Sequence, residues 1–271
     1  MIKLIRLLRN RKYLFLPDKR QRFALQTVIL TTGLLITQLI WEDYRFLMVG
    51  ILSVTSYVLT YWSLSEDIRG IKWILLFILP VLFTATVSLF YFLLPGRWII
   101  RLTIVIIFAL GTYANLLVEN IYNVAVSRSI QLLRVAQSVG FLISLAVVFL
   151  STSIILSLRL YAWQNILIIA PIAFLLALQS FWSVKLEKII SWQIILYALL
   201  VSIGIGELVM AISFWPIQLA TVSLCITASF YALVGIVQQY LLDRLFNNTV
   251  REYILVFLFT LVLTFLITRW G

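Results

Sequence analysis

The stretch WILLFILPVLFTATVSLFYFLL, residues 73–94, has no charged side chain in 22 positions. As a helix rising about 1.5 Å per residue it reaches about 33 Å, enough to cross a hydrocarbon core of about 30 Å. Similar apolar runs recur along most of the chain, whose 271 residues are 63% hydrophobic and only 11% charged. A water-soluble domain cannot bury so much apolar surface. The sequence therefore predicts an all-α fold, a polytopic transmembrane helix bundle.

The apolar runs and the polar breaks between them predict about nine spans. Their bounds are 23–40, 46–64, 73–94, 98–118, 135–158, 165–184, 189–214, 217–242 and 253–268. The count depends on two segments: the last run has only 16 residues, and residues 119–134 could form a loop, an interfacial helix or a helix extension. The expected division is a basic N-terminal interfacial segment, residues 1–22, followed by a transmembrane helical domain, residues 23–268.

Lysine and arginine are distributed unevenly between the two sides of this scheme. With the N-terminus inside, 16 of the 21 basic residues fall on the inner side, and the outer side keeps Arg45, Arg97, Arg101, Arg159 and Arg269. Cytoplasmic loops of membrane proteins are enriched in lysine and arginine. The distribution predicts an integral protein of the bacterial plasma (inner) membrane, with a cytoplasmic N-terminus and the C-terminus outside.

The first residues, MIKLIRLLRNRKYLF, carry basic and apolar side chains on different sides of a helix. Lys3, Arg6 and Arg9 would lie on one side, and Leu4, Leu7 and Leu8 on the other. This pattern suits an interfacial helix on anionic lipid headgroups at the inner face, and a simple basic tail that orients the chain is the alternative. The net charge of +11 does not indicate nucleic acid, because the cations sit in short loops.

The residue types present exclude several kinds of chemistry. The chain has no histidine, and Cys225 is its only cysteine, which excludes disulfides, Cys/His metal clusters and histidine-dependent catalytic triads. No motif of kinases, P-loop NTPases or zinc hydrolases is present. We therefore expect no metal site, no cofactor and no identified catalytic residue, and we lean toward a non-enzymatic protein.

Polar groups are concentrated in ANLLVENIYNVAVSRSIQLLR, residues 114–134. If this stretch continued one helix, Glu119 and Asn123 would lie on one side, and Glu119 would be about 32 Å from Trp98, at the inner interface. Three readings follow: a solvated cytosolic connector, a headgroup groove, or a salt-bridged vestibule of a transporter. In the groove, Arg128 and Arg134 would meet phosphate while Glu119 and Asn123 orient the headgroup.

Glu207 lies within an otherwise apolar span, about 10 Å from its outer end, beside Gly204 and Gly206. An unpaired charge in a membrane core costs about 2.5–3.5 kcal/mol or more, so Glu207 should point into the bundle. Arg101 lies at a similar depth and is the expected partner. The pair would be a structural ion pair, or Glu207 would be a protonation-coupled or substrate-contacting site, and a lipid-facing carboxylate would argue against a carrier built on Glu207.

The short loops and abundant tryptophan resemble those of uncharacterised bacterial polytopic inner-membrane protein families, a resemblance that transfers no site. WEDYR, residues 41–45, resembles the acidic first outer loop of multi-span polyprenyl-phosphate glycosyltransferases over Glu42 and Asp43 alone. Three function classes stay open. A carrier of a small or lipid-like substrate needs a polar cavity around Glu207 or Glu119, an enzyme acting on a lipid-linked substrate needs acidic and basic groups converging at one face, and a scaffold needs every polar group satisfied.

Overall fold

The computed structural model describes residues 18–37, 44–65, 72–94, 98–125, 131–187 and 189–268. Within them the chain forms nine α-helices and no strand. The helices are α2 (Lys19–Thr37), α3 (Arg45–Leu64), α4 (Lys72–Leu93), α5 (Trp98–Ala125), α6 (Leu133–Ser157), α7 (Ala162–Lys185), α8 (Trp192–Ile212), α9 (Leu219–Leu241) and α10 (Asn247–Ile267). Each corresponds to one expected span, so the all-α fold is confirmed.

Two helices are longer than the apolar pattern predicts. Helix α5 continues through the polar stretch to Ala125, although the expected span ended at residue 118. Helix α10 begins at Asn247 and has 21 residues, whereas the apolar run that predicted it has 16. At the other end of the chain, residues 19–22 form the first turn of α2, while residues 1–17 lie outside the described part.

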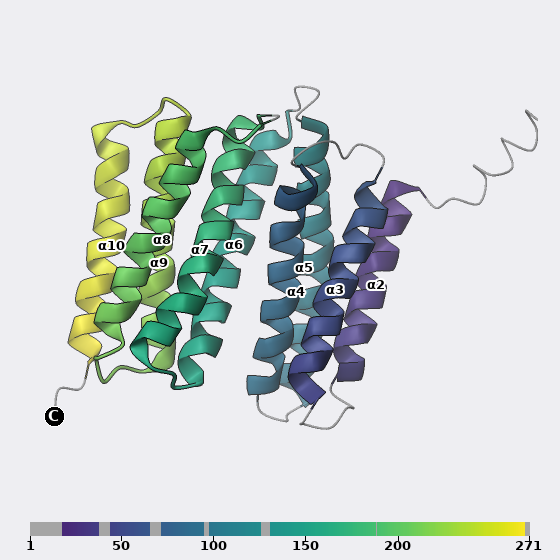
Figure 1. Cartoon of the computed structure of the whole chain (residues 1–271), viewed down its shortest axis with the longest axis horizontal. Coiled ribbons are helices and arrows are strands. Elements are labelled where there is room, and N and C mark those ends of the chain that lie inside the picture. Colours follow the sequence, from purple (N-terminus) through teal and green to yellow (C-terminus); the bar gives the residue numbers. More distant parts are fainter. Residues whose placement is uncertain are drawn as a thin grey trace, which may run out of the picture.

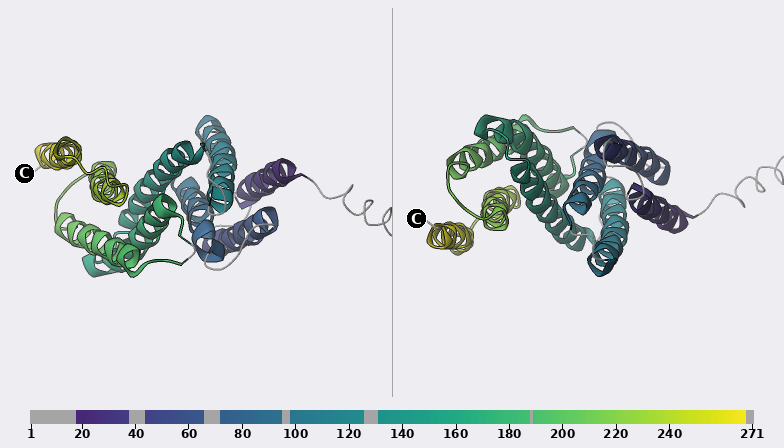
Figure 2. Two further views of the ribbon diagram at one scale, coloured as in Figure 1. Left: turned by 90° about the horizontal axis from the view of Figure 1, so that it is seen from above. Right: turned by 90° about the horizontal axis from the view of Figure 1, so that it is seen from below.

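The helices stand side by side and alternate in direction, as Figure 1 shows. Views along the helices show α2 and α10 at opposite extremes of an elongated bundle (Figure 2). Helix α4 packs on α3, α5, α6 and α7, and α6 packs on α5, α7 and α9, so these two join the first helices to the later ones. Among the described helices, α9 is the one substantial partner of α10.

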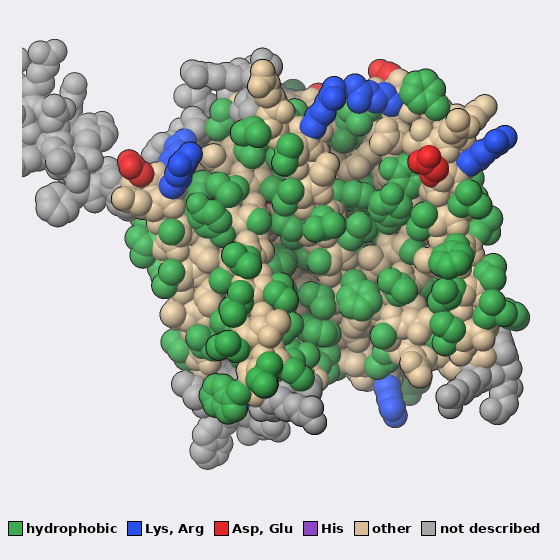
Figure 3. Space-filling view, turned by 180° about the vertical axis from the view of Figure 1, so that it is seen from behind, with side chains coloured by type: hydrophobic (Ala, Val, Ile, Leu, Met, Phe, Trp, Pro, Cys, Tyr) green, Lys and Arg blue, Asp and Glu red, His purple; other side chains and the backbone are tan. Residues whose placement is uncertain are grey.

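The surface of the bundle is that of a membrane protein. Eight of the nine described helices, α3 to α10, are long and apolar enough to cross a membrane. On the face drawn in Figure 3, charged side chains lie near the two ends, and the broad band between them has none. A bilayer interior excludes charge and accepts such an apolar band. The chain is therefore a multi-pass helical membrane protein.

Helix α2 falls outside that set of eight because it is rich in polar residues. Its polarity is inverted relative to a helix in water: Arg22 and Gln26 are buried, whereas Val28 and Ile36 are exposed. Arg22 also lies over the ring of Trp62, with its guanidinium carbon 5.7 Å from the ring centroid. Apolar side chains outside and polar ones inside suit a helix bordered by lipid on one side and protein on the other.

A chain of side-chain hydrogen bonds joins α2 to α3. The Gln26 amide donates to the Thr60 hydroxyl at 2.7 Å and accepts from the Ser63 hydroxyl at 2.7 Å. Thr60 in turn donates to the backbone carbonyl of Ser56 at 2.7 Å. Each polar atom of the Gln26 amide thus has a partner inside the bundle. Hydrogen bonds between helices take the place of water in such an interior.

Two helices carry a proline in their interior, Pro80 in α4 and Pro171 in α7. Proline has no N–H, so each removes one hydrogen bond of its helix. Hydroxyl groups bond the backbone at both places: Thr84 donates to the Pro80 carbonyl at 2.8 Å, and Ser202 of α8 donates to the Ala170 carbonyl at 2.7 Å. The carbonyls that the prolines free are those of Leu76 and Leu167, so these two bonds secure the neighbouring backbone and do not replace the missing ones.

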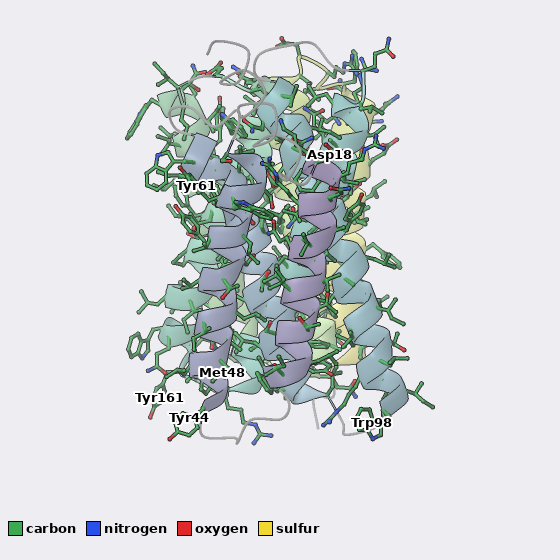
Figure 4. The ribbon with its side chains drawn as sticks, turned by 90° about the vertical axis from the view of Figure 1, so that its right-hand side faces the viewer. Asp18, Tyr44, Met48, Tyr61, Trp98 and Tyr161 are labelled. Atoms are coloured by element: carbon green, nitrogen blue, oxygen red, sulfur yellow. The ribbon has the colours of Figure 1, made fainter. Side chains whose placement is uncertain are left out.

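The two ends of the bundle differ in charge. We call the end at which α2 begins the basic end. The basic side chains described there are Lys19, Arg20, Arg22, Arg134, Lys185, Arg244 and Arg251, whereas those described near the opposite end are Arg101 and Arg159. Figure 4 shows Asp18 at the basic end and Tyr44, Trp98 and Tyr161 at the other. Aromatic rings and cations at the ends are typical of helices that reach headgroups.

Replacing Gln26 by alanine tests whether this buried network stabilises the bundle. The Ser63 hydroxyl loses its acceptor, and we expect the free energy of unfolding to fall by about 1–2 kcal/mol. Reversible unfolding in mixed micelles measures the change. Thr32→Ala is the matched control, because Thr32 is exposed on the same helix and bonds only to α2 backbone. Equal losses in the two variants would show that the network adds no stability.

Candidate functional site

Three polar residues of α5 lie on one side of that helix and are fully enclosed. The exposed fractions of Asn115, Glu119 and Asn123 are 1%, 0% and 1%. Steps of four residues keep side chains on one helix face. This face is covered because α5 continues to Ala125 and packs against α2, α4 and α6. The reading of these residues as a solvated cytosolic connector is therefore wrong: they lie inside the bundle.

Glu119 has one hydrogen bond, to a helix distant in sequence. The amide nitrogen of Gln179, on α7, donates to Glu119 Oε1 at 2.5 Å. The other carboxyl oxygen, Oε2, is buried and has no hydrogen-bond partner in the described structure. Burying a carboxylate without a cation or sufficient donors is strongly unfavourable. Glu119 is therefore neutral in this environment, or it holds a cation.

The atoms left without partners around Glu119 are all acceptors or hydroxyl groups. Glu119 Oε2, Asn115 Oδ1 and Gln179 Oε1 are buried and unpaired, as is the hydroxyl of Thr112, one turn before Asn115. Fully buried polar atoms are nearly always hydrogen-bonded, so several exceptions together need an explanation. We call Asn115, Glu119 and Gln179 the acid site. What it lacks is a donor or a positive charge.

A narrow polar crevice lies beside the acid site, on the side of the basic end. Its polar lining comes from α5, α6, α7 and α9: Tyr122, Gln137, Ser144, Gln179, Ser180, Ser183 and Gln238. The room inside is about 10 Å³, which fits roughly one water molecule. Gln179 belongs both to this crevice and to the acid site. The Gln179 side chain therefore both lines the crevice and contacts Glu119.

Close packing of α5 on α6 fixes the wall of the crevice. A Cβ atom added to Gly140 would lie 2.6 Å from the Tyr122 hydroxyl, so only glycine leaves room for that ring. The Tyr122 hydroxyl donates to the Ala136 carbonyl at 3.1 Å, and Gln137 donates to the Ser183 carbonyl at 2.8 Å. These bonds hold α6 against both α5 and α7 beside the acid site.

Of the two arginines expected to join Glu119, the one that the structure describes lies apart from it. Arg134 is exposed at the start of α6, whereas Glu119 is fully buried. Arg128 lies outside the described residues, as do Glu42 and Asp43. A headgroup groove that combines Arg134 with Glu119 and Asn123 is therefore not formed. Binding of anionic lipid by Arg128 and Arg134 at the surface of the basic end stays a prediction.

Glu207 does not point into the bundle, so that expectation is wrong. It is exposed on α8, while its neighbours Ile205 and Gly206 are buried. Gly206 faces α7, because a Cβ there would lie 3.3 Å from Ile166. One helical step of about 100° then turns Glu207 outward. The carrier argument built on Glu207 loses its basis.

The proposed partner of Glu207 lies elsewhere. Arg101 is half-buried on α5, and α5 and α8 share no substantial packing contact. The Nε of Arg101 is buried without a hydrogen-bond partner among the described residues. The expected pair of Glu207 and Arg101 is therefore not formed. Similar depth in two spans does not make two residues neighbours.

The sequence matches one family model, which describes a protein of unknown function (DUF5656), over residues 63–267. The chain belongs to the DUF5656 family. The matched region contains α4 to α10 and with them the whole acid site of this DUF5656 chain. No curated protein and no solved structure matches the chain. The family membership carries no activity, so function has to be argued from the residues.

Gln179 is the main residue of this DUF5656 site that the sequence reasoning missed. It stands in FLLALQSFWS, residues 174–183, as a single amide among mostly apolar neighbours. A lone amide within a membrane span is a signal of an interhelical hydrogen bond. The same signal applies to Gln26, which was also not singled out. Both amides have a hydrogen-bond partner on another helix.

A double-mutant cycle on Glu119 and Gln179 tests the hydrogen bond between them. Gln179→Ala removes the donor and should lower the free energy of unfolding by about 1–3 kcal/mol. Glu119→Leu keeps roughly the volume, removes both the acceptor and the unpaired acid, and should be neutral or stabilising. We expect the double variant to differ from the sum of the single effects by about 0.5–3 kcal/mol, measured by reversible unfolding in mixed micelles. Simple additivity would show that the two side chains do not interact.

Proposed function

We propose that this chain is a carrier of a small or lipid-like substrate in a bacterial inner membrane, and that Glu119 is its proton-binding site. The observation that supports this is the buried carboxyl group with one unpaired oxygen. Ionisable residues within membrane helices mark proton relays and substrate pathways more often than they serve packing. The acid site is enclosed by the helices, and Glu119 lies six residues before the end of α5 at Ala125.

Proton binding would supply what the acid site lacks. An ionised carboxylate only accepts hydrogen bonds, whereas a protonated carboxyl also donates one. Two unpaired acceptors belong to the acid site beside Glu119. Asn115 Oδ1 is one helical turn away on α5, and Gln179 Oε1 is on the side chain that donates to Glu119. A protonated Glu119 could donate to one of them. Loss of the proton leaves a charge that the surroundings do not pair, which favours a rearrangement of the helices.

The crevice gives this proton a route. It is lined by hydroxyl and amide groups from four helices and ends at Gln179, which contacts Glu119. Water and polar side chains in series conduct protons in membrane proteins. Since the crevice lies toward the basic end, the proposed exchange is with the compartment that faces that end.

A scaffold and an enzyme are less well supported by the same observations. A scaffold should have its buried polar groups satisfied, and the acid site has three unpaired oxygens. An enzyme acting on a lipid-linked substrate should bring acidic and basic groups together at one face. In the described residues, Glu119 is enclosed and Arg134 is exposed, so that convergence has no support there.

The orientation that we propose places the N-terminus and the basic end in the cytoplasm. The described lysine and arginine side chains at the two ends support it, because cytoplasmic loops retain such residues. The crevice and the acid site would then open to the cytoplasm.

Cysteine labelling in intact cells tests the orientation. Cys225 is buried, so an added surface cysteine should dominate the reaction. We expect an impermeant maleimide to label Tyr161→Cys, which is exposed at the end opposite the basic end, and to spare Leu245→Cys, which is exposed between α9 and α10. Both should react after the cells are opened. The reverse pattern in intact cells would invert the proposed topology.

Transport in proteoliposomes tests the role of Glu119. The protein is reconstituted into liposomes with an imposed pH gradient, and fractions of bacterial metabolites are added one at a time. We expect at least one fraction to cause proton movement, which a pH-sensitive dye reports. Glu119→Gln should reduce that flux at least tenfold, because an amide cannot release a proton. Glu207→Gln is the matched control, since Glu207 is an exposed acid in another span, and it should retain the flux. Equal proton flux in the wild type and Glu119→Gln would show that Glu119 takes no part in proton transport.

A further inference from the structure

A second cavity lies at the end of the bundle opposite the basic end. It has about 300 Å³ of room and lies between the turn joining α6 to α7 and the turn joining α8 to α9. Its lining includes Arg159, Asn165, Ser213 and Trp215 beside apolar side chains. The volume reaches the lower range of small-molecule sites. We call this cavity the Arg159 pocket.

The backbone at the mouth of the pocket is held in place by tight turns. Arg159 has a φ of 51°, in the left-handed region, and its N–H donates to the Leu156 carbonyl at 3.2 Å. On the other side, the Trp215 N–H donates to the Ile212 carbonyl at 2.9 Å. The Trp215 ring also meets Phe265 of α10 edge to face, with centroids 6.0 Å apart. The backbone of Arg159 and Trp215 is thus held by turns, and the Arg159 side chain is exposed at the mouth of the pocket.

Positive potential converges on the pocket from three sources. Arg159 supplies a full charge. Ala162 and Leu219, which also line the pocket, are the first residues of α7 and α9. The start of a helix presents unpaired N–H groups and a partial positive charge that favour anions. The described lining contains no acidic residue to offset them.

Asn165 shows that the pocket also needs a hydrogen-bond donor. Its side chain is only 4% exposed, and its Oδ1 is buried without a partner in the described structure. Ser213 uses its own hydrogen in a bond to the Val209 carbonyl at 2.7 Å, so its oxygen is available only as an acceptor. A buried amide acceptor without a partner is explained by a donor that the described chain does not supply, either a water molecule or a ligand toward which the Asn165 amide turns.

We propose that the Arg159 pocket binds a phosphate ester that carries free hydroxyl groups, with the chemistry of glycerol phosphate. The phosphate would lie at Arg159 and the two helix starts, and a hydroxyl would donate to Asn165 Oδ1. Trp215 and the apolar lining would contact the carbon skeleton. The ligand is either the headgroup of a lipid such as phosphatidylglycerol or a free polyol phosphate. The proposal is independent of proton binding at Glu119, which lies toward the other end.

Binding to purified, delipidated full-length protein in detergent tests the proposal. The probes are short-chain phosphatidylglycerol, short-chain phosphatidylcholine and glycerol 3-phosphate, with affinity measured by titration and the melting temperature as a second readout. We expect phosphatidylglycerol or glycerol 3-phosphate to bind at least tenfold more tightly than phosphatidylcholine. Preference for the lipid identifies a headgroup site, and preference for glycerol 3-phosphate identifies a site for a soluble ester.

Two variants and one control separate ligand binding from folding. Arg159→Asn suits the left-handed backbone and should weaken binding at least tenfold. Asn165→Leu should weaken binding several-fold without lowering the melting temperature of the ligand-free protein, because Asn165 Oδ1 has no bond to lose. Arg134→Gln, at the basic end, should bind as the wild type does. Unchanged affinity in Arg159→Asn, or equal binding of phosphatidylcholine, would overturn the proposal.

Discussion

A hydrocarbon interior offers no hydrogen-bond partners, and this constraint governs the whole molecule. Backbone groups are satisfied within the nine helices that the structure describes, and side-chain polar groups must turn toward other helices. Helix α2 shows the result clearly: its glutamine is enclosed and its valine and isoleucine side chains face outward. The serine and threonine hydroxyls of the bundle follow the same constraint, most of them by bonding a carbonyl one turn back in their own helix.

Against this background the unpaired groups stand out as places where the protein interior is incomplete. Three of them belong to the acid site near the basic end, and one, Asn165 Oδ1, lies at the Arg159 pocket near the opposite end. The first offers oxygen acceptors around a carboxyl group, and the second offers positive potential with one amide acceptor. The two sites therefore present opposite electrostatic environments. A single packed bundle thus holds two chemically distinct environments on the two sides of the apolar band.

The sequence was sufficient to predict the helices, but it did not predict which face of each helix is buried. Hydropathy places most spans to within a few residues, because crossing a bilayer sets a minimum apolar length, but α5 and α10 extend further into polar sequence than it predicts. It also sorts Asn115, Glu119 and Asn123 onto one face, but whether that face meets water or protein depends on which helices cover α5. Glu207 shows the same limit: the glycine beside it takes the packed position, and the carboxylate turns outward. Interhelical partners such as Gln179, 60 residues from Glu119, cannot be obtained from spacing.

One helix takes part in both sites. Helix α7 carries Asn165 at its start and Gln179 near its end, which are about 21 Å apart along the helix axis at 1.5 Å per residue. Pro171 lies between them, at a point where the helix lacks one of its hydrogen bonds and bends most easily. A change in that bend shifts the two amides relative to each other. Helix α7 is thus one continuous element that carries a residue of each site, with its most easily bent point between them.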